Sequence, residues 1–181
     1  MKTQLFASTL ALTALVSAQA AQAQEACVEP ADLNDTITYA APLALDAAMT
    51  SCGDQYSANG FMRSESAEFA DRFREKQDAA WPGTFRLLQV FMNQRAGENG
   101  EGDAAMSAMI SAMPEEQLRP FVDALITQMI AGEIKPKTCG DIENILELIA
   151  PLPVENISGL ATLIMEMVEL DDPAICSAES K

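Results

Sequence analysis

The four cysteines are the residues of this chain with the most possible chemical roles, since a thiol can bind metal, attack a substrate or form a disulfide. They are Cys27, Cys52, Cys139 and Cys176. They lie far apart, with no C-x-x-C pair and no histidine, which argues against a zinc site or a redox dithiol. An even number in an exported chain indicates two disulfides, and three pairings are possible. We favour Cys27–Cys52 and Cys139–Cys176, because each pair brackets one helical stretch or hairpin.

Catalytic motifs are absent from the sequence. The chain has no histidine, so no histidine-based triad can form. G-x-S-x-G, glycine-rich phosphate loops and H-E-x-x-H are also missing, and oxidised cysteines do not act as nucleophiles. We therefore expect no catalytic residue and no cofactor, and an enzyme is the least favoured class of function.

Two groups of side chains could bind a metal ion. Five methionines offer thioethers, which suit Cu(I), but their helical spacing is also typical of a buried apolar face, which we favour. The acidic residues of segment 98–103 could bind Ca²⁺, but they lack the spacing of a calcium-binding loop. We interpret that segment as a solvated linker and predict no metal site. The methionines are Met106, Met109, Met113, Met165 and Met167.

The first 23 residues have the order of a secretory signal. Lys2 precedes an uncharged apolar run over residues 5–18, which is too short to span a bilayer. Two A-Q-A triplets allow cleavage after Ala20 or Ala23, and we favour Ala23. Residues 24–181 then form one acidic domain of ordinary size. We find no membrane span in this mature chain and expect a periplasmic or secreted protein.

The charge of the chain narrows the range of partners. Removal of the signal takes away one of 11 basic residues, and the remaining 10 against 27 acidic residues give a net charge of −17. Such a protein repels phosphates, so we expect no nucleic-acid partner. Acids dominate from Asp141 onward, and we expect a basic segment to pack beside those acidic helices. Its bases are Arg63, Arg72, Arg74, Lys76, Arg86 and Arg95.

The apolar periodicity is helical, and strand-like alternation is almost absent. We predict an all-α single domain of about six helices. The first covers 32–50, with a break or kink near Ala40 because of Pro42, and a loop follows at 53–63. The second begins at Ser64 and ends at Trp81-Pro82-Gly83. The others are expected at 84–95, which should be buried, at 103–113, at 118–130 with Pro120 in its first turn, and in a C-terminal unit.

The C-terminal unit is predicted to be an αα-hairpin. Residues 141–150 form its first arm, Pro151-Leu152-Pro153 the turn, and residues 157–168 the second arm. The large apolar residues of both arms are expected to face inward. A Cys139–Cys176 disulfide would then clamp the two open ends.

Two classes of function fit these features. The first is a periplasmic protein-interaction module, such as an adaptor, an inhibitor or a holdase-like protein, which binds an unknown protein partner. The second is a carrier that holds a lipid or another apolar ligand between its helices. A contiguous exposed apolar patch would favour the first, whereas an enclosed apolar cavity would favour the second.

Overall fold

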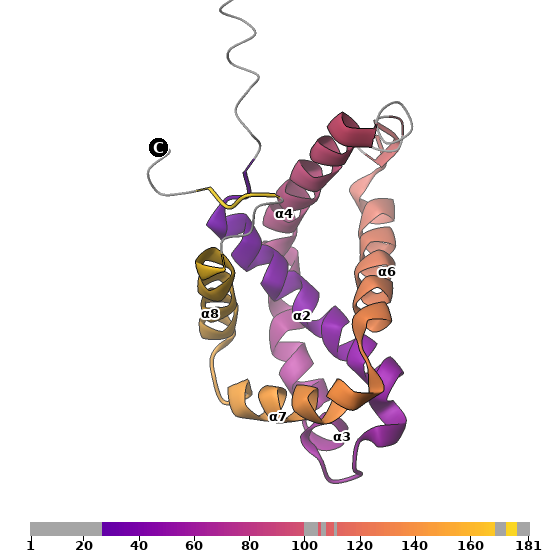
Figure 1. Cartoon of the computed structure of the whole chain (residues 1–181), viewed down its shortest axis with the longest axis vertical. Helices are drawn as coiled ribbons and strands as arrows, with labels where there is room; N and C mark the ends of the chain where they lie inside the picture. The colour runs from indigo at the N-terminus through magenta and orange to yellow at the C-terminus, as the bar shows by residue number, and fades with distance from the viewer. Residues whose placement is uncertain (1–26, 100–104, 106–107, 111, 169–172, 177–181) are drawn as a thin grey trace, which may run out of the picture.

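The computed structural model describes residues 27–99, 105, 108–110, 112–168 and 173–176 (Figure 1). The predicted signal segment and its cleavage site lie outside these residues. The helices are α2 (Pro30–Cys52), α3 (Phe61–Ser64), α4 (Ser66–Asn99), α6 (Glu115–Glu133), α7 (Cys139–Ile149) and α8 (Val154–Met167), with 3-10 turns η1 (Gly53–Gln55) and η2 (Pro136–Thr138). The only extended pairing within the described ranges is an isolated parallel bridge between Val28 and Ile175. The all-α prediction is therefore confirmed.

The helices form a crossed pair bordered on three sides (Figure 1). α2 crosses the molecule diagonally in front of α4, and these two share the most extensive helix contact. α6 and α8 flank α2 on opposite sides, and α7 closes one end between them. We call α6, α7 and α8 the frame. Both α6 and α8 pack on α2, so α2 is the floor that the frame helices share.

α4 runs without interruption through Trp81-Pro82-Gly83, so the prediction of two helices meeting there was wrong. Pro82 faces solvent. Trp81 stacks on Phe85 with ring centroids 5.9 Å apart and packs 5.3 Å from Tyr39 of α2. A proline inside a helix costs about 3 kcal/mol. Burial of a large aromatic side chain contributes a similar amount, so packing against α2 offsets the proline.

Gly83 permits a close crossing of two helices and does not stop α4. A Cβ at this position would lie 2.6 Å from Cβ and 2.8 Å from Cγ of Asp35 in α2. Only glycine therefore lets α2 approach α4 at this point. Next to this crossing, Arg86 of α4 donates to Asp32 of α2 from Nε at 3.0 Å and from Nη2 at 2.6 Å.

Several predicted boundaries also differ from the structure. α2 is continuous through Pro42, which excludes a break near Ala40 and leaves a kink as the remaining prediction. The predicted loop at 53–63 contains η1 and α3. Segment 84–95 is part of α4 and exposes Phe91, so it is no central buried helix.

The start of α6 and the segment before it also differ from the predicted boundaries. α6 begins at Glu115, which places Pro120 in its second turn. Residues 105 and 108–110 are helical, and the rest of the predicted 103–113 helix lies largely outside the described residues. In the predicted linker at 98–103, residues 98 and 99 belong to α4 and residues 100–103 are not described.

Two apolar clusters hold the crossed pair together. One contains Phe69 and Phe73 of α4 and takes in Cys52 and Cys139. The other is built on Tyr39 and Trp81 and includes buried residues of α6.

No helix in the described ranges combines the length and the apolarity needed to cross a membrane.

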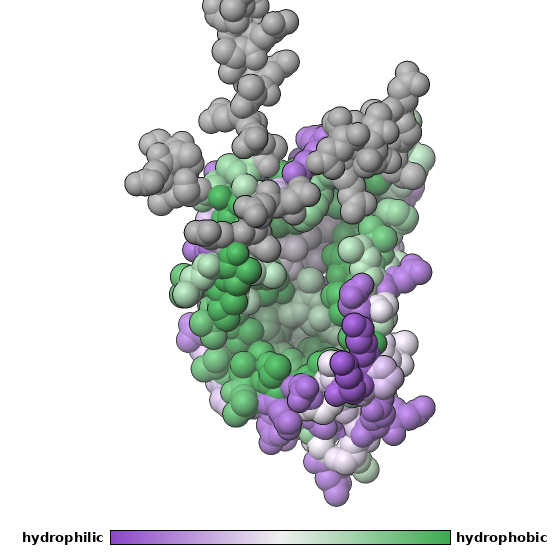
Figure 2. All heavy atoms as spheres, viewed as in Figure 1, coloured by the Kyte–Doolittle hydropathy of each residue, from purple (hydrophilic) through white to green (hydrophobic). Residues whose placement is uncertain are grey.

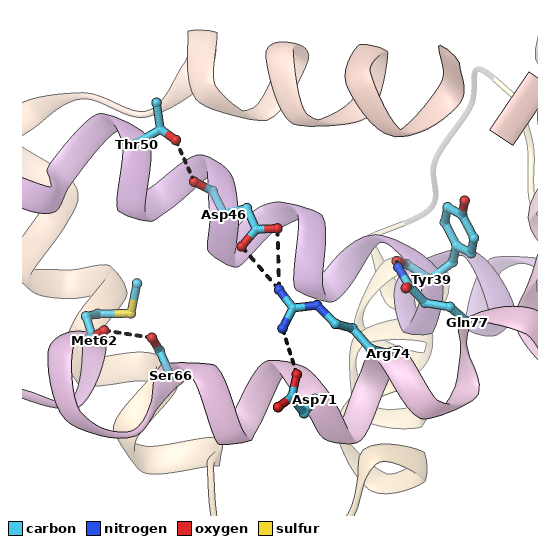
Figure 3. A network of polar contacts seen from close by, with 8 residues as sticks. All are labelled: Tyr39, Asp46, Thr50, Met62, Ser66, Asp71, Arg74 and Gln77. Atoms are coloured by element: carbon cyan, nitrogen blue, oxygen red, sulfur yellow. Dashed lines mark hydrogen bonds and ion pairs between the residues drawn. The ribbon is translucent and has the colours of Figure 1, made fainter. Parts of the chain in front are cut away.

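A line of polar contacts fixes the register of α2 on α4 (Figure 3). Arg74 of α4 donates to Asp46 of α2 at 3.3 Å and to Asp71 of its own helix at 2.8 Å. Gln77 donates to the backbone carbonyl of Tyr39 at 2.9 Å. The Arg74 pairs are exposed, and each such pair contributes at most about 1 kcal/mol. These contacts therefore specify alignment more than they add stability.

The four cysteines form two disulfides, Cys27–Cys176 and Cys52–Cys139. The expectation of two bridges is confirmed, but both predicted pairings are wrong. The end of α2 meets the start of α7, with the Cα atoms of Cys52 and Cys139 5.7 Å apart. The chain then returns to the start of α2, where the Cα atoms of Cys27 and Cys176 are 5.0 Å apart. The bridges span 87 and 149 residues, and in the chain-entropy model each contributes about 4–5 kcal/mol.

α7 and α8 meet at a corner and do not form the predicted disulfide-clamped hairpin (Figure 1). α4 holds this corner in place. Arg72 donates to the backbone carbonyls of Ala150 at 2.6 Å and Leu152 at 3.2 Å, and Lys76 pairs with Glu155 at 2.6 Å. The expectation that the basic segment packs beside the acidic helices is confirmed at Arg72 and Lys76.

Candidate interaction surface

α8 packs on α2 through its small side chains. Val154, Ser158 and Thr162 are buried, and Ser158 is only 1% exposed. The two hydroxyls donate to backbone carbonyls one turn earlier, Ser158 to Val154 and Thr162 to Ser158, both at 2.9 Å. Burial therefore leaves neither hydroxyl without a partner. Gly159 also faces α2, but a Cβ there would lie at an ordinary contact distance of 3.9 Å from the Asn34 amide, so the packing does not require a glycine.

The large apolar residues of α8 lie on its exposed side. Leu160, Leu163, Ile164 and Met167 follow the i, i+3, i+4, i+7 spacing of one helix stripe, and Met167 is 74% exposed. The prediction that these residues and Val168 face inward was wrong, whereas Ile157, also predicted to face inward, packs against the first cluster. An amphipathic helix of a monomer ordinarily buries this stripe in its own core, so α8 is inverted relative to the usual arrangement.

α7 and α6 divide their apolar residues between the core and the exterior. In α7, Ile142, Leu146 and Ile149 pack against the core as predicted. Ile145 was predicted to face inward but is exposed, and Leu148 is 78% exposed.

The same division holds for α6. Leu118 and Val122 are buried and Ile126 packs beside them. Phe121, Leu125 and Met129, at i, i+4 and i+8, are exposed.

Together the exposed stripes make a surface that we call the open apolar face. In Figure 2, apolar residues gather along α8, along α7 and along the side of α6 that borders a hollowed centre. Its members are Phe121, Leu125, Met129, Ile145, Leu148, Leu160, Leu163, Ile164 and Met167. Monomeric proteins rarely expose a large contiguous apolar patch, and such a patch marks an interaction site.

Covalent and polar links add to the buried apolar contacts that attach the frame to the crossed pair. α7 is tied to α2 by Cys52–Cys139, and α8 to α4 by Lys76–Glu155. α6 is tied to α2 by the Tyr39 hydroxyl, which donates to Asp123 at 2.5 Å. Burial and this hydrogen bond to Asp123 raise the pKa of Tyr39, so the hydroxyl keeps its proton at neutral pH.

Arg119 adds a second link from α6. It pairs with Asp78 of α4 at 2.8 Å. Its guanidinium lies 5.0 Å from the ring centroid of Trp81 and 5.8 Å from that of Tyr39. This geometry permits cation–π attraction to both rings. The one basic side chain of α6 is therefore used inside the fold.

A cavity of about 540 Å³ that is largely open to solvent, the corner cavity, lies between α6 and α7. Met129, Ile130, Ile134 and Ile142 give it apolar walls, and Glu133 and Thr138 supply a carboxylate and a hydroxyl. Its volume is in the range of pockets for small ligands. Apolar walls with one carboxylate suit a ligand that has an apolar body and a basic group.

The methionines do not all have the predicted core role. Met109, Met165 and Met167 are exposed, and Met113 is partly buried against the second cluster. Met106 lies outside the described residues. Exposed methionines are flexible and polarisable, which suits a surface that adapts to more than one apolar shape.

Comparison with protein-family models, with curated proteins and with solved structures finds no match to the chain. The surface must therefore be interpreted from its own chemistry.

No group of three or more His, Cys, Asp or Glu side chains suited to a metal ion occurs among the described residues.

The open apolar face was missed at the sequence level because periodicity shows that a helix has two faces but not which one packs. One signal was available. Ser158 and Thr162 follow Val154 at four-residue spacing, so α8 has a second, small-residue stripe. Such a stripe can support close helix packing even though it is less apolar than the opposite one.

Proposed function

We propose that this protein is an exported interaction module that binds an apolar segment of a partner protein through the open apolar face. The observation that carries the proposal is the inverted α8, which buries Ser158 and Thr162 and exposes a full leucine and methionine stripe. Burial of one exposed leucine-sized side chain contributes about 1.5–3 kcal/mol. A partner that covers several of these side chains would therefore gain substantial free energy.

The alternative is a carrier of a lipid or another apolar ligand. The corner cavity favours it, because it is large enough for part of such a ligand. The exposed apolar residues, however, extend over three helices and surround an open hollow. An open surface supports a protein partner, whereas a carrier gains most by enclosing its ligand.

Export is part of the proposal. A signal over residues 1–23 would send the chain to the periplasm or outside the cell, where disulfides persist. The two disulfides support such an oxidising compartment. N-terminal sequencing of the protein from its native compartment should give Gln24 as the first residue, and a free-thiol count should give none.

Site-specific photo-cross-linking in cells that produce the protein tests the partner. We would place a photoreactive side chain at Leu148 or at Leu163, and for matched controls at Ala67 or Ala79, which are exposed on α4. We expect discrete protein adducts from the two face positions only. Lipid adducts would favour the carrier. Equal adducts at all four positions, or none, would contradict a role for the open apolar face.

A further inference from the structure

From the charge of the frame we infer that the partner segment is a cationic amphipathic α-helix. This inference rests on the proposed function and specifies the ligand of the same surface. It follows from the shape of the surface, from the charge of the three helices that form it and from the corner cavity.

The shape of the surface favours a helix over an extended strand. The frame and its floor are helices, and among the described residues no strand edge is present to which a peptide could add. Helical walls recognise a helix through side chains at i, i+3, i+4 and i+7. A helix laid in the hollow could contact the exposed stripes of α6 and α8 from its two sides.

The charge of the frame is strongly acidic. By sequence α6 has four acids, α7 three and α8 two, against a single base, Arg119. Arg119 is already paired with Asp78. Glu133, Asp141, Glu147 and Glu166 form no ion pair with any residue that the structure describes. A partner rich in lysine or arginine beside its apolar stripe complements these carboxylates.

The corner cavity gives one basic residue of the partner a defined place. A lysine or arginine has an aliphatic stem that could pack on Met129, Ile134 and Ile142, while its head reaches Glu133. Lys135 and Lys137 lie in the connection between α6 and α7, but neither pairs with Glu133 in the described structure. Glu133 therefore remains available to a basic group from outside.

A second copy of this chain is a poorer occupant. Two chains with a net charge of −16 each would bring two acidic frames together, and like charges across an interface oppose association. The same surplus of acids disfavours an anionic lipid surface.

Binding of designed peptides to the purified, disulfide-bonded protein tests the inference. We would use amphipathic helical peptides of about 18 residues that share one leucine stripe and carry lysine, glutamine or glutamate on the polar face. A scrambled lysine peptide without the stripe controls for attraction by charge alone. Isothermal titration calorimetry should show the lysine peptide binding at least about tenfold more tightly than the glutamine peptide. The glutamate and scrambled peptides should bind more weakly than both.

Two variants separate the contributions of charge and apolar contact. Glu133→Gln should weaken the lysine peptide about threefold to tenfold and leave the glutamine peptide unchanged. Glu68→Gln, which removes one exposed charge from α4, should change neither. Leu163→Asp should weaken both peptides, with an unchanged circular dichroism spectrum as the check on folding.

The possible failures are distinguishable from failure of the proposed function. Equal binding of lysine and glutamine peptides would overturn the cationic partner but keep an apolar one. Equal binding of the scrambled peptide would also overturn it, since charge alone would then suffice. Protein adducts at Leu163 without binding of any peptide would support the interaction module but contradict a helical partner segment. Dimerisation in sedimentation, abolished by Leu163→Asp, would assign the surface to a second copy.

Discussion

Asp35 lies where α2 crosses α4, with Gly83 close against its side chain. Burial raises the pKa of Asp35, the neighbouring Asp32 raises it further, and Arg86 lowers it in part. The native state therefore holds the proton of this carboxyl more tightly than the unfolded state does. As pH rises above the ordinary value of 3.8, ionisation of Asp35 costs native stability.

Replacing Asp35 by asparagine should therefore stabilise the protein at neutral pH. The amide has nearly the same shape and carries no charge. We expect a higher Tm for Asp35→Asn at pH 7 and an advantage that disappears below about pH 3, where the carboxyl is also neutral. Thermal unfolding followed by circular dichroism at both pH values measures this. Asp54→Asn, at an exposed position, is the control. A loss of stability of equal size at every pH would show that Asp35 acts through packing.

At the residue scale the sequence predicted which cysteines are oxidised but not how they pair. Cys52 lies next to Cys27 in the order of cysteines, yet its partner is Cys139. Pairing depends on where the crossed helices bring the chain ends, and nothing local to a cysteine reports that. The same limit applies to Gly83, whose role depends on Asp35 of another helix.

Among the elements, α8 offers the most direct test of which side of a helix packs on the core. Val154, Ser158 and Thr162 are its buried residues, and Ile157 packs against the first cluster, whereas its stripe of Leu160, Leu163, Ile164 and Met167 is exposed. Ser158→Leu should therefore lower the free energy of unfolding by about 1–3 kcal/mol, because it overpacks the contact with α2. Leu163→Ser should stay within about 0.5 kcal/mol of the wild type, as surface substitutions do. Urea unfolding measures both, and the reverse order would mean that α8 packs by its leucine stripe.

Removal of Cys52–Cys139 should lower the free energy of unfolding more than removal of Cys27–Cys176. Loop length alone predicts the opposite order. Chain entropy favours Cys27–Cys176, which spans more residues, by only about 0.5 kcal/mol. Cys52 and Cys139 are 1% and 2% exposed and belong to the core, so their removal also leaves a cavity. We expect Cys52→Ala/Cys139→Ala to cost about 1–2 kcal/mol more than Cys27→Ala/Cys176→Ala. Equal losses in denaturant unfolding would show that the core closes around the smaller side chains.

Helix existence was predictable along most of the chain, and helix boundaries less so. The proline and glycine after Trp81 are ordinary stop signals, and they failed because aromatic packing on Tyr39 holds α4 together across them. The periodicity of α7 correctly placed Ile142, Leu146 and Ile149 toward the core but also assigned Ile145 to it, which stays exposed. A single stripe of apolar residues can serve both a core and a surface, and only the packing divides it.

At the scale of the whole molecule, α8 packs on α2 less extensively than α4 does. α2 and α4 share the most extensive contact, and α7 is tied to α2 by a buried disulfide. α8 is attached by three buried residues, by Ile157 against the first cluster, by an exposed ion pair with Lys76 and, beyond its end, by the Cys27–Cys176 bridge. The lowered pKa of Glu155, caused by its hydrogen bond to Lys76, means that this pair contributes above the ordinary value of 4.5 and weakens as pH falls.

Hydrogen exchange should show this difference in packing between α8 and the crossed pair. Elements with few buried contacts open at lower free energy than the core, so amides of α8 should exchange sooner than those in the middle of α2 and α4. Cys27→Ala/Cys176→Ala should accelerate exchange in α8 and leave the middle of α4 unchanged, because the bridge restrains the chain just beyond α8. Lowering the pH toward 4 should act in the same direction through Glu155, once the intrinsic rate is corrected for. Equal acceleration in every helix would instead mean that α8 opens only when the whole molecule unfolds, and a partner would then meet a rigid surface.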